Sequence, residues 1–221
     1  MNAKAIVFDF NGTLFFDYKE NLDAWNIISK KYRGREFYSE EYDSLMGMTD
    51  PCVVRAMKND VSDEEAYQIA NEKEELYLKL CKERKLTLVK EAVEFIKYVQ
   101  SLSIKTAIAS SAPKGNMEWY YNNLGLDKLF KSDEIICDPP GLKSKPEPDI
   151  FRLALRIVGI SAEDAICFED SPGGLKAALR TPFKKTIAVL SPGMSEEKQS
   201  AFVSPISWSC ILEHKDEIIK L

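Results

Sequence analysis

This chain is poor in histidine, and its cysteines follow no pattern. The only histidine among its 221 residues is His214, which excludes catalytic triads built on histidine and metal sites built on several histidines. The five cysteines are scattered and form no C-x-x-C pair, so the sequence supports neither a zinc site nor a disulfide framework. We expect reduced thiols in a cytoplasmic protein. Acids, bases and nucleophiles must then come from carboxylates, hydroxyls, lysine or cysteine.

Long apolar runs and an excess of positive charge are also missing. The apolar run in MNAKAIVFDF is too short for a signal peptide or a membrane span. Thirty basic against 35 acidic residues give a net charge of −5, which disfavours attraction to nucleic acid or anionic membranes. We therefore expect neither partner, and take a monomer as the default. An anionic substrate would need local neutralisation by a cation, a lysine or backbone N–H groups.

Short apolar runs have the character of buried strands. They lie at residues 4–9, 104–110, 133–137, 164–170 and 185–190, the last at a sheet edge. From residue 89 onward, the stretches between these runs have apolar residues at helical spacing. This alternation predicts an α/β fold, a Rossmann-like parallel sheet with helices on both faces. Ligands of such sheets bind beyond the carboxyl ends of the strands.

Residues 15–85 break this alternation, because they are rich in charges and aromatics and contain no convincing strand. Within them, Ser62 and Glu65 have the spacing of a capping box at the start of a long helix. We therefore predict an α-helical cap domain at 15–85. It would be inserted into a catalytic core made of residues 1–14 and 86–221.

Two of the predicted strands end in carboxylates. Asp9 ends the first and is followed by Asn11 and Gly12, while Glu169 and Asp170 end the fourth. A buried carboxylate is costly unless a cation or donors lie beside it, and neighbouring anions favour a hard cation such as Mg²⁺. Either segment alone is also compatible with an ordinary turn. Together, at one edge of a parallel sheet, they indicate a metal site.

Two further segments offer groups for a phosphoryl oxygen. Ser110 and Ser111 lie at the end of the second predicted strand, where a hydroxyl and backbone N–H groups could hold such an oxygen. Lys145 lies in KPEP, whose prolines fix the position of its charge just before an amphipathic helix. Either feature alone is weak evidence for a phosphate site, since adjacent serines and solvated lysines are common.

The segments DFNGTL, IASS, SKPEPDIF and FEDSPGGL occur in this order, and together they resemble the four motifs of the haloacid dehalogenase superfamily. The resemblance covers nearly the whole chain and is to the branch of capped phosphatases and β-phosphoglucomutase-like enzymes. It implies that Asp9 attacks phosphorus and becomes a transient aspartyl phosphate. Catalysis would then rest mainly on electrostatic positioning of the phosphoryl group.

The resemblance also implies a role for each matching residue. The phosphoryl group would be bound by Ser110, Ser111, Lys145 and Gly12. The Mg²⁺ ion would be held by Asp9, Asp170 and the backbone carbonyl of Asn11, with Glu169 supporting metal-bound water and orienting Lys145. From the cap, Gly47 would face the active site.

The departure from the family is Asn11, where active phosphatases of the family carry a second aspartate that protonates the leaving group and later activates water. An amide does neither, and losing such acid–base help typically costs about 10²–10⁴ in rate. Natural divergence, a substitution made to trap a complex, and partial deamidation of the Asn-Gly pair are all compatible with the sequence.

The expected function is a Mg²⁺-dependent phosphatase of a small phosphorylated metabolite, slowed by Asn11. A binding or regulatory protein that holds the phosphometabolite with impaired catalysis is the alternative, because the same amide motivates it. A sugar phosphomutase is a further alternative. It is disfavoured because Thr49 and Asp50 follow Gly47 where such mutases usually carry a basic residue for the distal phosphate.

Overall fold

A single parallel sheet organises the protein. The computed structural model describes residues 2–137, 141–193 and 196–220. Its strands are β1 Ala5–Phe8, β2 Lys105–Ser110, β3 Ile135–Cys137, β4 Ala165–Glu169 and β5 Lys185–Ala188. They pair in the order β3-β2-β1-β4-β5, every pair parallel. Each strand falls within a predicted apolar run and β5 is at the edge, so the predicted α/β fold is confirmed.

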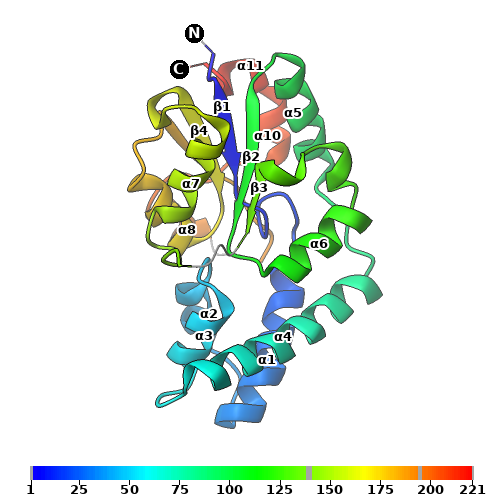
Figure 1. Cartoon of the computed structure of the whole chain (residues 1–221), viewed down its shortest axis with the longest axis vertical. Coiled ribbons are helices and arrows are strands. Elements are labelled where there is room, and N and C mark those ends of the chain that lie inside the picture. The colour runs from blue at the N-terminus through cyan, green and yellow to red at the C-terminus, as the bar shows by residue number, and fades with distance from the viewer. Residues whose placement is uncertain (1, 138–140, 194–195, 221) are drawn as a thin grey trace.

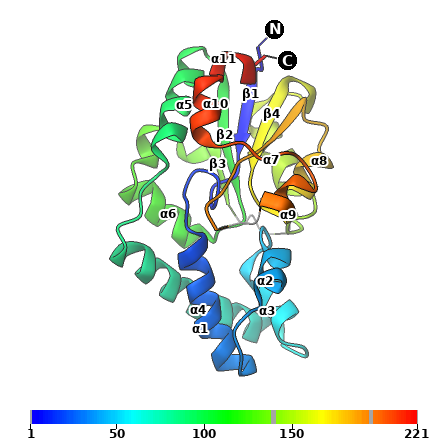
Figure 2. The same cartoon turned by 180° about the vertical axis from the view of Figure 1, so that it is seen from behind.

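Helices cover both faces of this sheet (Figures 1 and 2). One face packs against α5 Lys90–Ser101, α6 Lys114–Asn123 and α10 Trp208–Glu213, and the other against α7 Asp149–Val158 and α8 Pro172–Leu179. Because side chains alternate along a strand, β1 gives Ile6 and Phe8 to the first face, and Ala5 and Val7 to the second. The central strand is therefore buried on both sides, which explains its unbroken apolar run.

A group of helices lies beyond the carboxyl ends of the strands (Figure 1). It consists of α1 Tyr18–Arg33, α2 Ser39–Leu45, α3 Asp50–Met57 and α4 Asp63–Glu83, and we call residues 18–83 the helical layer. The layer has an apolar cluster of its own, formed by residues such as Trp25, Ile28 and Val54. The predicted capping box is formed in part: the Ser62 hydroxyl caps α4 by accepting a hydrogen bond from the Glu65 backbone N–H at 3.1 Å, while the Glu65 carboxylate pairs with Lys58.

The remaining described elements are short. They are the 3₁₀ turns Leu126–Lys128, Ser132–Glu134 and Ala162–Asp164, and the helices α9 Glu196–Ser200 and α11 Lys215–Ile218. His214 is exposed between α10 and α11. Asn2 and Lys220 form an isolated bridge, which places both termini at the end of the sheet opposite the helical layer (Figure 1). Within the described residues, no helix combines the length and the apolar character that crossing a bilayer requires.

Candidate active site

The carboxyl ends of three adjacent strands bring the predicted site residues together. Asp9 directly follows β1, Ser110 ends β2 and Asp170 directly follows β4, and β1 lies between the other two strands. The turn after Asp9 passes close to Asp170. A Cβ on Gly12 would lie 2.0 Å from Asp170 Oδ2, and Gly12 has φ +78°, so only glycine fits there without displacement.

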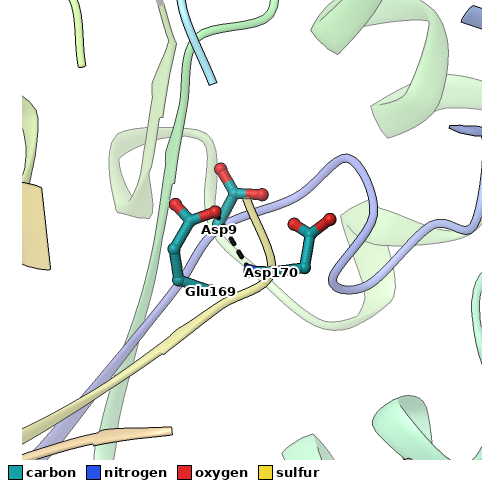
Figure 3. Close-up of side chains that lie close together, drawn as sticks. All are labelled: Asp9, Glu169 and Asp170. Carbon is teal, nitrogen blue, oxygen red and sulfur yellow. Dashed lines mark hydrogen bonds between the residues drawn. The ribbon is translucent and has the colours of Figure 1, made fainter. Parts of the chain in front are cut away.

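A cluster of buried carboxylates forms the floor of the site. Oxygens of Asp9, Glu169 and Asp170 all lie within 4.8 Å of one another, and Figure 3 shows Asp9 between the other two. Burial and the charge of Glu169 raise the pKa of Asp9 to about 7. Burial, Glu169 and Asp9 likewise raise the pKa of Asp170 well above its usual value. Burial and neighbouring negative charge thus both disfavour ionisation of these two carboxyls.

The donor set fits a hard divalent cation. Thr13 donates a hydrogen bond to Asp170 Oδ1 at 3.1 Å, whereas Asp170 Oδ2 is buried and has no hydrogen-bond partner among the described residues. A buried carboxylate oxygen without a donor is costly unless a cation binds it. Oxygen ligands from few carboxylates are what Mg²⁺ prefers in proteins. A bound cation would also lower the pKa of Asp9 and keep it ionised.

Lys145 supplies the one positive charge that contacts this cluster in the described structure. Its Nζ donates to Asp9 Oδ1 at 2.6 Å and to Glu169 Oε2 at 2.7 Å, and its side chain is buried. Burial alone would lower the pKa of Lys145, but the two carboxylates outweigh it and raise that pKa above its usual value. The lysine therefore stays protonated beside Asp9.

Glu169 has donors on both of its oxygens. Oε2 accepts from Lys145, and Oε1 accepts from the backbone N–H groups of Asp170 and Ser171 at 3.0 Å and from the Ser171 hydroxyl at 2.9 Å. This pattern holds Lys145 in place and anchors the start of α8. It leaves Glu169 better suited to orienting its neighbours than to binding a metal directly.

The Asn11 side chain faces the helical layer. Its Nδ2 donates to Asp17 Oδ2 at 2.8 Å and to the Tyr77 hydroxyl at 3.1 Å, and lies 3.4 Å from the Tyr120 hydroxyl. Asp17 also accepts from the Gly12 N–H at 3.1 Å and from Tyr77 at 2.5 Å, and burial raises its pKa. Sequence reasoning missed Asp17, since one acidic residue between a strand and a helix carries no signal.

The two serines after β2 are placed differently. Ser110 is buried, and its Oγ accepts a hydrogen bond from the Ala112 N–H at 3.1 Å. Ser111 donates to the Gly47 carbonyl at 2.8 Å and so links the core to the helical layer. Gly47 has φ +88°, and a Cβ there would lie 2.6 Å from Ser171 Oγ. The loop carrying Gly47 thus approaches the start of α8 closely.

A cavity of about 90 Å³ lies between the core and the helical layer. The predicted site residues that line it are Asp9, Asn11, Gly12, Gly47, Ser110 and Ser111. Lys145, Glu169 and Asp170 are not in its lining and contact Asp9 or its turn from the core side. The structure therefore brings all the predicted residues to one place.

The lining of this cavity also contains a second buried lysine, Lys73, that the sequence analysis did not single out. Lys73 Nζ lies 2.6 Å from Glu74 Oε1 and 3.2 Å from Asp50 Oδ2, and Asn116 donates to the other oxygen of Glu74. Burial would lower the pKa of Lys73, but Asp50 and Glu74 raise it to about 12. Burial and Asp50 raise the pKa of Glu74 well above its usual value.

A signal for Lys73 was present in the sequence. Ala66, Ile69, Ala70 and Tyr77 form the buried stripe of α4, and Lys73 continues that stripe at helical spacing. A charged residue in an apolar stripe is rarely buried unless it is paired. Its partners could not be read from the sequence, because Asp50 belongs to another helix.

Fold and site define a class: a Rossmann-like protein with an acidic centre at the carboxyl edge of its sheet. The sequence model of the haloacid dehalogenase-like hydrolases matches residues 3–180. The chain belongs to this family, and the resemblance carried by the four motifs is confirmed. The protein is accordingly an enzyme of the hydrolase class.

Similar proteins agree with this assignment. A phosphorylated carbohydrates phosphatase from Thermotoga maritima is 27% identical over 192 residues, 85% of each chain. A validoxylamine A 7'-phosphate phosphatase from Streptomyces hygroscopicus subsp. limoneus is 25% identical over 185 residues, 80% of this chain and 81% of that protein. The crystal structure of a HAD hydrolase, family IA, variant 3, from Entamoeba histolytica has a TM-score of 0.85 at 29% identity, covering 99% of this chain and 100% of that one.

Proposed function

We propose that this protein is a Mg²⁺-dependent phosphatase of small phosphorylated metabolites and that Asp9 is its nucleophile. The observation that carries the proposal is the pairing of Asp9 with Lys145 at 2.6 Å, beside an Asp170 oxygen that has no partner in the described structure. Phosphoryl transfer requires a nucleophile, a fixed positive charge and a carboxylate that can bind a metal ion. Asp9, Lys145 and Asp170 would supply these three groups. The phosphatase names of two relatives support the same reaction class.

Asp9 and Asp170 would hold Mg²⁺, together with the backbone carbonyl of Asn11. When bound, the ion would neutralise negative charge on the carboxylates and the substrate phosphate. Glu169 would act beside it by orienting Lys145, because both oxygens of Glu169 already have donors.

In the proposed reaction, an Asp9 oxygen attacks phosphorus while the bond from phosphorus to the ester oxygen breaks, which releases the leaving group and leaves an aspartyl phosphate. Water then attacks phosphorus, releasing inorganic phosphate and regenerating the Asp9 carboxylate. Lys145 stabilises the phosphoryl oxygens in both steps, with the Ser110 hydroxyl as a further donor. The helical layer would act as a cap that keeps bulk water out of the cavity.

Asn11 limits this chemistry. Its amide donates hydrogen bonds to Asp17 and Tyr77, so the side chain is held in place but has no proton to exchange with a leaving group. We therefore expect good leaving groups, which depart without protonation, to react much faster than alkoxides. The same amide supports a second candidate function, a protein that binds a phosphometabolite and serves as a sensor or regulator.

The test uses p-nitrophenyl phosphate and acetyl phosphate, which both have good leaving groups. We expect turnover that requires Mg²⁺, stops on chelation and is lost in Asp9→Asn. The matched control is Asp127→Asn. It removes an exposed carboxylate that is not in the cavity lining, and it should leave turnover intact. Tight Mg²⁺-dependent binding of a phosphate ester without any turnover would contradict the phosphatase hypothesis and support the second candidate function, a binding protein.

A further inference from the structure

Two side chains from the C-terminal part of the chain donate hydrogen bonds to the turns that carry the acidic cluster. Gln199 is fully buried in α9, and its Nε2 donates to the backbone carbonyl of Asp170 at 2.8 Å. Trp208 begins α10, and its Nε1 donates to the backbone carbonyl of Thr13 at 2.7 Å. Both residues lie beyond residue 180, where the match of the family model ends. Their role therefore does not follow from membership of the family.

Asp170 is held both at its backbone and at its side chain. Gln199 fixes its carbonyl, while Thr13, whose own carbonyl accepts from Trp208, donates to Asp170 Oδ1 at 3.1 Å. Asp170 Oδ2 is left buried and without a partner among the described residues. Groups that hydrogen-bond a ligating carboxylate set the direction of its free oxygen. The contacts around Asp170 are therefore those of a metal ligand oriented by its neighbours.

Gln199 also connects two strand ends. The same Nε2 donates to the backbone carbonyl of Val189 at 2.8 Å. Val189 comes directly after β5 and Asp170 directly after β4, and these two strands are paired in the sheet. One side-chain nitrogen thus fixes the position of Asp170 relative to the sheet edge.

Stability alone does not account for an amide at position 199. The Oε1 atom of Gln199 is buried without a hydrogen-bond partner among the described residues. An unpaired buried acceptor costs free energy, and this cost offsets much of what the two donated hydrogen bonds contribute. An apolar side chain of similar size would hold the fold about as well, but it would leave the Asp170 carbonyl without its donor.

We propose that Gln199 and Trp208 are positioning residues of the metal site, which hold Asp170 so that its Oδ2 faces the divalent cation. The inference rests on the proposed function, in which Asp170 is a ligand of Mg²⁺. It adds that the segment 196–213 completes the metal site through Gln199 and Trp208, although these two residues do not bind the ion themselves.

Calorimetric titration of the substrate-free protein with Mg²⁺ tests Gln199. Gln199→Met keeps the length of the side chain and removes the amide, and it should raise the apparent Kd about tenfold, as is typical when a ligand loses its hydrogen-bond partner. Gln100→Met is the matched control, because Gln100 Nε2 also donates to two acceptors, Thr106 and Leu129, outside the site. This control should bind Mg²⁺ as the wild type does. Equal Kd values for Gln199→Met and the wild type would overturn the role of Gln199.

The same titration tests Trp208. Its ring is stacked on Phe168 of β4, with centroids 5.5 Å apart, so Trp208→Phe keeps an aromatic ring there and removes the N–H. The Kd should rise about fivefold, less than for Gln199→Met, because Trp208 acts on Asp170 only through Thr13. Trp119→Phe, the same substitution outside the cavity lining, is the control and should not change the Kd. An unchanged Kd in Trp208→Phe would remove this residue from the proposal.

Turnover distinguishes positioning from a loss of folding. At limiting Mg²⁺, Gln199→Met should hydrolyse p-nitrophenyl phosphate about tenfold more slowly than the wild type, and saturating Mg²⁺ should restore the rate because every ligand is still present. A deficit that saturating Mg²⁺ does not remove would show a structural role instead. Circular dichroism confirms folding. If Gln199→Met does not fold, Gln199→Asn, whose amide is one methylene shorter, takes its place.

The two readouts also separate this inference from the proposed function. If the wild type binds Mg²⁺ but hydrolyses no phosphate ester, the phosphatase is contradicted, and the Kd values of the variants still decide the inference. If the wild type is a phosphatase and both variants bind Mg²⁺ as it does, only the inference fails. A wild type that binds no Mg²⁺ would overturn both.

Discussion

Two buried lysines of this protein each lie between two carboxylates. At the carboxyl edge of the sheet, Lys145 lies 2.6 Å from Asp9 and 2.7 Å from Glu169, and in the cavity lining Lys73 lies 3.2 Å from Asp50 and 2.6 Å from Glu74. Among the described residues, only the Lys145 group has a neighbouring carboxylate oxygen that is buried without a hydrogen-bond partner, that of Asp170. We therefore expect the Lys145 group to hold a divalent cation and react, and the Lys73 group to affect substrate binding only.

Replacing each lysine by glutamine tests most strongly this division of roles, with reaction at Lys145 and substrate binding at Lys73. Lys145→Gln should lower kcat for p-nitrophenyl phosphate by about 10²–10³-fold, because it removes the charge that stabilises the phosphoryl oxygens. Lys73→Gln should act mainly on KM. Each variant leaves two buried or largely buried carboxylates without their cation, so urea unfolding should show losses of about 3–5 kcal/mol in both. An equal fall in kcat for the two variants would contradict the division.

Asn11 and Asp17 test the missing acid–base group. Asn11→Asp alone would place a carboxylate where the amide now lies 2.8 Å from Asp17 Oδ2, so repulsion should limit its benefit. The exchanged pair Asn11→Asp with Asp17→Asn keeps one carboxylate and one amide in contact. We expect the pair to raise turnover of an alkyl phosphate by about 10²-fold and the single variant to raise it less.

Peptide mapping must first show that the wild-type preparation has amide at Asn11, since partial deamidation would mimic the variant. Asp17→Asn alone is the control for loss of the carboxylate at position 17. A larger gain in Asn11→Asp than in the exchanged pair would show that Asp17 does not oppose a carboxylate at position 11.

Mg²⁺ should stabilise the protein more at high pH. The pKa of Asp9 is raised from 3.8 to about 7, so the folded protein without metal binds more protons than the unfolded chain in this range. Stability from this group is therefore lost as the pH rises from about 4 to about 7. Mg²⁺ bound to the ionised carboxylates opposes that loss.

Thermal unfolding with and without Mg²⁺ at pH 5 and pH 8 measures the effect. We expect the increase in melting temperature on adding Mg²⁺ to be larger at pH 8, by about 5 °C, and to vanish in Asp170→Asn. An equal increase at both pH values would mean that the cation binds elsewhere.

Ser62→Ala should have the smallest effect. It removes the hydrogen bond that caps α4, the helix that carries Lys73 and Glu74, and should lower the free energy of unfolding by about 1 kcal/mol. Because α4 carries Lys73 and Glu74 in the lining of the cavity, KM should change more than kcat. Urea unfolding and steady-state kinetics check both expectations, and Ser101→Ala, an exposed position in a core helix, is the control.

The residues around Asp9 could be predicted from the sequence, whereas the ion pairs of Lys73 could not. Asp9, Asp170 and Ser110 lie where apolar runs stop, and a parallel sheet sends those points to one edge, so local patterns sufficed. Lys73 and Asp50 come from different helices whose relative placement depends on packing in the helical layer. Asn116 reaches Glu74 from a core helix across the cavity, a contact that no local pattern contains.

Tyr120 illustrates the same limit. It lies in α6 and is buried among Phe10 and Phe15. Its hydroxyl, however, lies 2.8 Å from that of Tyr77 and 3.4 Å from Asn11 Nδ2. Periodicity places a side chain on a buried face, but it does not show which polar groups from other elements will meet it there.

The most direct measurement is the intact mass of the protein quenched during turnover of acetyl phosphate with Mg²⁺. We predict a species heavier by one phosphoryl group, which peptide mapping assigns to Asp9 and which is absent from Asp9→Asn and after chelation. Turnover with no such species, or a phosphoryl group on another residue, would contradict the assignment of Asp9 as the nucleophile.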